Sequence, residues 1–108
     1  MAQPSDLKHP ELRAIFTDAH RALREGDPTG AVHRCADAFL LLASAYPAVL
    51  QIPAGMRIHP FPRLGANLVL GDGVAPAVEY SRERFSLSEA ITYYEYTLGA
   101  ATRCTNGT

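Results

Sequence analysis

The chain has 108 residues, of which 47% are hydrophobic and 19% charged, and its ten basic and eleven acidic residues give a net charge of −1. This length and composition predict one globular domain, residues 1–108, with a modest core, and they exclude a disordered chain. The near-neutral charge gives no electrostatic reason to expect nucleic acid binding.

The first predicted element is a helix over residues 10–25. Pro10 suits the first helical position, and Gly26 is a natural end. The preceding stretch, MAQPSDLKHPELR, lacks the basic-then-apolar order of a signal peptide, and no apolar run approaches the roughly 20 residues of a transmembrane helix. We therefore expect a cytoplasmic protein. The predicted buried face of this helix consists of Leu12, Ile15, Phe16, Ala19 and Leu23.

The second predicted helix covers residues 28–46. Asp27 can cap it, Pro28 fits its first turn, and Pro47 stops it. Leu40 and Leu41 fall outside its apolar stripe, so the second half of this helix is apolar on nearly every side. The stripe itself consists of Val32, Cys35, Ala36, Phe39, Leu42, Ala43 and Tyr46.

Residues 47–85 form a segment rich in proline and glycine. Within it, two apolar runs flank Gly71–Asp72–Gly73, which predicts a small β-hairpin over residues 66–80. Two strands alone are only marginally stable in water, so this hairpin has to pack on the helices or pair with another chain.

The third predicted helix covers residues 86–101. Ser86 and Glu89 have the spacing of a capping box. Residues 102–108 are polar and are expected to form a flexible tail. The overall expectation is a mainly α (α+β) fold with a helical hairpin and a capped third helix. The predicted core stripe of the third helix is Leu87, Ala90, Ile91, Tyr94, Leu98 and Ala101.

Two stretches, GAVHRCADAFLLLA and EAITYYEYTLGAA, resemble each other and are similar to the second helix of a tetratricopeptide-type hairpin. They are 59 residues apart, whereas that repeat has a period of about 34. We therefore interpret the likeness as general helix pairing and not as family membership.

Tyr93 and Tyr96 lie on a different flank of the third helix from Tyr94. Tyrosine suits a surface that is apolar along the ring and wet at the hydroxyl. One interpretation places these rings inside the domain, over the hairpin. The other, which we follow, is an interaction or assembly domain that pairs as a homodimer, because leaving such side chains in water forgoes roughly 1.5 to 3 kcal/mol each. The predicted interface consists of Leu40, Leu41, Tyr93 and Tyr96.

A second hypothesis is a small enzyme or an anion-binding protein, with a site at the dimer seam that also uses tyrosine hydroxyls. The alternative is a solvated rim in which Asp72, Glu79 and Glu83 neutralise the arginines. The candidate anion ligands are Arg57, His59, Arg63, Arg82 and Arg84.

Arg13 and His20 resemble the Arg-x(4–6)-His pattern of a family of small helical ribonuclease domains that act as dimers, and the simpler interpretation is two solvent-facing residues. His20, His33 and Asp37 are ligand types for a metal, but their spacing matches no established site, so no metal is predicted.

Cys35 and Cys104 have no metal-ligand spacing, and both are expected to stay reduced in a cytoplasmic protein. No catalytic motif is recognisable and no cofactor is expected. The sequence therefore does not decide whether the protein is an enzyme.

Overall fold

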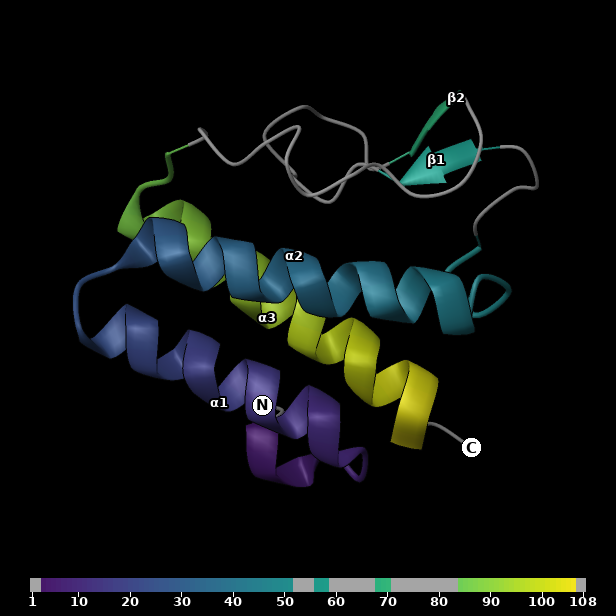
Figure 1. The fold of residues 1–108 in the computed structure, drawn as a ribbon, viewed down its shortest axis with the longest axis horizontal. Helices are drawn as coiled ribbons and strands as arrows, with labels where there is room; N and C mark the ends of the chain where they lie inside the picture. The colour runs from purple at the N-terminus through teal and green to yellow at the C-terminus, as the bar shows by residue number, and fades with distance from the viewer. Residues whose placement is uncertain (1–2, 52–55, 59–67, 71–83, 107–108) are drawn as a thin grey trace.

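The computed structural model describes residues 3–51, 56–58, 68–70 and 84–106, without the side chains of residues 56–58 and 68–70. Three α-helices dominate these residues (Figure 1). They are α1 (Pro10–Arg24), α2 (Pro28–Ala45) and α3 (Leu87–Asn106), and a short 3₁₀ helix, η1 (Pro4–Asp6), precedes α1. The predicted mainly α character of the chain is confirmed.

Each α-helix begins with a side chain that accepts a hydrogen bond from an otherwise unpaired backbone N–H. His9 Nδ1 accepts from Leu12 N at 3.3 Å, and Asp27 Oδ1 accepts from Gly30 N at 3.0 Å. At α3, Ser86 Oγ accepts from Glu89 N at 3.2 Å while Glu89 Oε1 accepts from Ser86 N at 2.9 Å. The capping box predicted from the sequence is therefore present.

Helix α2 packs against both other helices, and α1 and α3 also contact each other. The tight joint between Arg24 and Pro28 turns the chain back, so α1 and α2 run in opposite directions, whereas α2 and α3 run in the same direction (Figure 1). Phe85 N donates to Thr29 Oγ1 at 3.0 Å, which fixes the start of α3 beside the start of α2. The chain therefore leaves α2 at one end and enters α3 beside the other end of α2.

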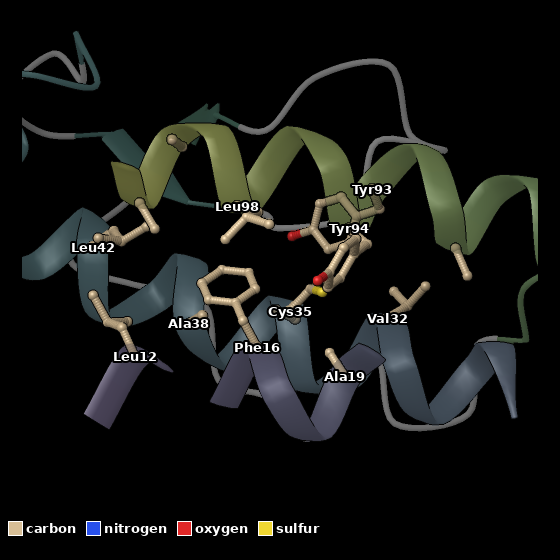
Figure 2. Close-up of a cluster of buried hydrophobic side chains, with 14 of the residues drawn as sticks. Leu12, Phe16, Ala19, Val32, Cys35, Ala38, Leu42, Tyr93, Tyr94 and Leu98 are labelled. Carbon is tan, nitrogen blue, oxygen red and sulfur yellow. The ribbon is translucent and has the colours of Figure 1, made fainter. Parts of the chain in front are cut away.

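The core fills the space between the three helices (Figure 2). Phe16 of α1 meets Tyr94 of α3 edge to face, with ring centroids 6.2 Å apart. Leu7, between η1 and α1, also belongs to this core. Its buried residues are Leu7, Leu12, Phe16, Ala19, Val32, Cys35, Ala36, Ala38, Leu42, Phe85, Ala90, Tyr93, Tyr94, Leu98, Ala100 and Ala101.

Two short strands, β1 (Met56–Ile58) and β2 (Leu68–Leu70), pair antiparallel, with Met56 opposite Leu70 and Ile58 opposite Leu68. The hairpin predicted over residues 66–80 lies largely outside the described residues and stays a prediction. Within the described residues, the partner of β2 is β1.

Helix α3 continues beyond its predicted end at residue 101, so the flexible tail predicted from residue 102 is wrong for residues 102–106. Thr102 Oγ1 and Thr105 Oγ1 donate back to the carbonyls of Leu98 and Ala101, at 2.9 and 2.8 Å. Asn106 then contacts the backbone of residues 6–8. These polar side chains are used within the fold, which a prediction based on apolar residues alone could not anticipate.

Candidate functional site

The three tyrosines of α3 lie in three different environments. Tyr93 is 1% exposed, Tyr94 is buried, and Tyr96 is 49% exposed. The prediction that Tyr93 lies on the surface with Tyr96 is therefore wrong. The buried face of α3 is turned towards Tyr93 and Thr97, and for the same reason Leu87 and Ile91, predicted in the core, are exposed.

Tyr96 continues a row of rings that begins in the core. Its centroid lies 6.5 Å from that of Tyr93, with a 17° angle between the ring planes, and 6.1 Å from that of Phe39, with a 28° angle. Phe39 is buried. We call Phe39, Tyr93 and Tyr96 the aromatic seam. It joins α2 to α3 and presents half of one tyrosine to solvent.

Aliphatic side chains surround the α2 side of the aromatic seam. Phe39 and Ala43 form a small cluster of their own, and the half-buried Leu40 and Leu50 pack against it. Val49, next to Leu50 in the chain, is 48% exposed. This surface is therefore apolar around an aromatic centre, the composition typical of protein interfaces.

Leu41 lies apart from the aromatic seam. It is 43% exposed and lines a small pocket of about 130 Å³ where the start of α1 meets the end of α2. The predicted four-residue interface is therefore divided: Tyr96 and Leu40 lie at the seam, Tyr93 lies inside, and Leu41 lies elsewhere. The pocket is lined by His9, Glu11, Leu12, Leu41, Leu42, Ala45 and Tyr46.

Most of the predicted anion-binding side chains are not among those that the structure describes. His59, Arg63 and Arg82 lie outside the described residues, and Arg57 belongs to β1, whose side chains are not described. Arg84 is exposed just before α3. The anion-binding hypothesis consequently stays a prediction.

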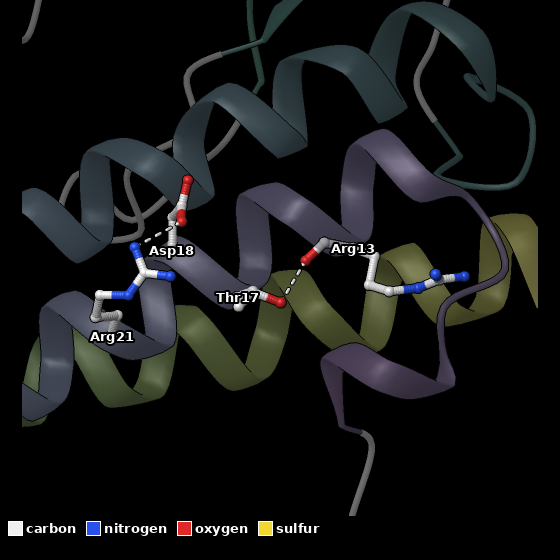
Figure 3. A network of polar contacts seen from close by, with 4 residues as sticks. All are labelled: Arg13, Thr17, Asp18 and Arg21. Atoms are coloured by element: carbon white, nitrogen blue, oxygen red, sulfur yellow. Dashed lines mark hydrogen bonds and ion pairs between the residues drawn. The ribbon is translucent and has the colours of Figure 1, made fainter.

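A polar cleft of about 450 Å³ lies where α1 ends and α2 begins. Two of its carboxylates already have partners: Asp18 forms an ion pair with Arg21 at 3.1 Å (Figure 3), and Asp27 caps α2. The charges that line the cleft are mixed, which gives no preference for an anion or a cation. The lining residues are Asp18, Arg21, Ala22, Glu25, Asp27, Gly30, His33 and Arg34.

The histidines and Arg13 do not converge on one site. His20 lies against Tyr94, with ring centroids 5.9 Å apart, whereas His33 lines the polar cleft. Arg13 Nε donates to Leu7 O at 2.9 Å, and its guanidinium points away from that of Arg21 (Figure 3). Among the described residues, no three His, Cys, Asp or Glu side chains are placed to hold a metal ion.

The cysteine thiols are kept protonated by the fold. Burial raises the pKa of Cys35 to about 12, although a hydrogen bond with Thr97 acts in the opposite direction. The Tyr94 hydroxyl lies beside the Cys35 sulfur (Figure 2), and burial, together with Cys35, raises the pKa of Tyr94 to about 12. Burial also raises the pKa of Cys104, against an opposing effect of Arg103. The thiolate is the reactive form, so neither cysteine is an activated nucleophile at neutral pH.

A comparison of the chain with models of known protein families, with curated proteins and with solved structures finds no match. Within the parts of the chain that the structure describes, no helix combines the length and the apolar character needed to cross a membrane. Among the candidate sites, the aromatic seam is the one whose geometry and exposure point to a definite kind of contact.

Proposed function

We propose that this protein is a small interaction module that forms a homodimer through the surface around Tyr96. The observation that carries the proposal is the half-exposed Tyr96 ring, which is stacked on buried Tyr93 and Phe39. A ring held in this way loses little side-chain entropy when a partner covers it, because its orientation is already fixed. A cytoplasmic location belongs to the same proposal.

A second copy is the occupant that fits this surface best. Half-exposed Tyr96 and half-buried Leu40 lie at the seam, and exposed Val49 is next in the chain to Leu50, which packs on the Phe39–Ala43 cluster. Twofold pairing places the same apolar patch on both partners, so each copy supplies the complement of the other. The proposed dimer interface therefore includes only the part of the predicted interface where α2 meets α3. Leu41 lies outside it.

The expected association is weak. Covering the remaining half of a large apolar side chain contributes roughly 1 kcal/mol, and only about three such side chains lie on each copy. The loss of translational and rotational freedom offsets much of this gain, so we expect an association that is visible only at high protein concentration. Concentration therefore decides whether the dimer is observed.

Light scattering from about 10 μM to about 1 mM tests the proposal on the wild-type chain and two variants. Tyr96→Glu places a charge in the seam and should keep the protein monomeric at every concentration. Leu41→Glu is the matched control, because its side chain is about as exposed but lies away from the seam. It should dimerise like the wild type.

Tyr96→Phe separates ring burial from hydroxyl chemistry and should leave the association unchanged, because the ring provides the contact. Circular dichroism should show that all variants keep their helices. A wild-type protein that stays monomeric at about 1 mM, or a Leu41→Glu variant that alone loses association, would contradict the proposal.

A further inference from the structure

The amide of Asn106 joins the end of α3 to the segment before α1. Asn106 Nδ2 donates to Asp6 O, and Oδ1 accepts from Lys8 N at 3.4 Å and from Thr105 Oγ1 at 3.0 Å. We call the contacts between Asn106 and residues 6–8 the Asn106 clasp. They connect positions about a hundred residues apart in the chain.

The Asn106 clasp holds an apolar side chain in the core. Leu7, between Asp6 and Lys8, is 1% exposed. The Leu7 carbonyl also accepts a hydrogen bond from Arg13 Nε at 2.9 Å, which is a second restraint on this segment. Because Leu7 lies between two anchored residues, loss of the clasp would weaken the burial of Leu7 and release residues 3–8 together.

Gly107 follows Asn106 in the sequence. We propose that Asn106 is a site of spontaneous deamidation and that this modification opens the clasp. A glycine after asparagine has no side chain to shield its backbone nitrogen, which makes that nitrogen the most accessible nucleophile for the neighbouring amide.

The reaction needs only water. The backbone nitrogen of Gly107 attacks Cγ of Asn106 and forms a C–N bond, while the bond from Cγ to Nδ2 breaks. The departing amino group takes the proton of the attacking nitrogen and leaves as ammonia. Water then opens the resulting cyclic imide, which gives aspartate or isoaspartate at position 106, and no electrons are gained or lost.

The product keeps only the part of the clasp in which an oxygen at position 106 accepts from Lys8 N. A carboxylate at position 106 has no N–H to donate to Asp6 O, and it faces that carbonyl as a second acceptor. It also places a negative charge at the C-terminal end of α3, where the helix dipole is already negative. Both effects favour the released form of residues 3–8.

The rate at which Asn106 deamidates should depend on how often the Asn106 clasp opens. While the clasp is closed, Nδ2 and Oδ1 of Asn106 are held by hydrogen bonds, so the side chain can rotate into a reactive orientation mainly when the clasp opens. The rate of deamidation should therefore follow the open fraction, as expected for local unfolding. Removal of the Arg13 restraint should increase that rate.

The experiment follows the full chain in mildly alkaline buffer by isoelectric focusing, with mass spectrometry to locate the change. The wild type should accumulate a more acidic form modified at Asn106, and Gly107→Leu should not. Arg13→Ala should accumulate it about fivefold faster, the change in population that corresponds to about 1 kcal/mol for one hydrogen bond. Arg24→Ala, an exposed arginine at the other end of α1, is the matched control and should behave like the wild type.

Amide hydrogen exchange tests the structural consequence in the Asn106→Asp variant. The amides of Asp6 and Leu7, which bond to Gln3 O and Pro4 O, should exchange faster than in the wild type, while those in the middle of α2 should not change. Equal rates of acidification in wild type and Gly107→Leu would overturn the assignment of the site. Unchanged exchange at residues 6 and 7 in Asn106→Asp would overturn the role of the clasp.

Discussion

At Cys35 an ionisable thiol lies fully buried beside the Tyr94 hydroxyl, between α2 and α3. Burial raises its pKa from 9.0 to about 12, so the folded protein holds this proton more tightly than the unfolded chain does. The resulting stability is fully present below pH 9 and is lost as the pH rises towards 12.

We therefore expect the free energy of unfolding to fall by about 1.4 kcal/mol per pH unit above pH 9, where the thiol begins to titrate in the unfolded chain. Urea titrations at a series of pH values measure this slope. Cys35→Ala should reduce it between pH 9 and pH 10, below the range in which Tyr94 contributes, and leave the smaller part that comes from the raised pKa of Cys104. An identical slope in Cys35→Ala would show that another group is responsible.

Among single residues, those that act through local chemistry could be predicted from the sequence. Ser86 and Glu89 form a capping box because their spacing alone permits it, and Asp27 caps α2 for the same reason. The clasp formed by Asn106 could not be predicted in this way. Its partners lie about a hundred positions earlier, and nothing in the local sequence indicates that pairing.

At the scale of an element, α3 shows how a helix with apolar residues on several sides selects its buried face. Successive residues differ by about 100° around a helix, so the neighbours Tyr93 and Tyr94 lie at two edges of one broad apolar arc. The sequence predicted an arc centred on Tyr94 and Ile91. Packing against α2 turns α3 so that Tyr93 is buried and Ile91 is exposed. Periodicity could not distinguish the two, because either face is apolar enough to be buried.

The two faces of α3 should differ sharply in their contribution to stability. Tyr93→Ala removes a fully buried ring and should cost about 3–5 kcal/mol. Tyr96→Ala removes a half-exposed ring and should cost about 1 kcal/mol or less in the monomer. Urea denaturation at low protein concentration measures both without interference from association. Equal losses in the two variants would indicate that α3 is rotated from the orientation described here.

At the scale of the whole molecule, the parallel arrangement of α2 and α3 sets the minimum length of the connection between them. The 18 residues of α2 span about 27 Å. A connection that returns to the start of α2, where Phe85 N meets Thr29 Oγ1, needs at least about 8 extended residues. The proline- and glycine-rich composition of residues 47–85 predicted a break between helices. It did not predict that the helices on either side would run in the same direction, which depends on long-range packing.

This geometry leads to a prediction about the length of the connection. Replacement of residues 52–83 by a Gly/Ser linker of about 16 residues should preserve the helical content and a single cooperative unfolding transition, because such a linker exceeds the distance to be spanned. Deletion of residues 48–83 leaves five residues between Ala45 and Leu87, fewer than the minimum of about 8, and α3 should then pack on α2 of another copy as a swapped dimer. Circular dichroism measures the helices, and light scattering distinguishes the swapped dimer, because it should persist at concentrations at which the association through Tyr96 is lost. A deletion variant that stays monomeric and fully helical would contradict the parallel arrangement.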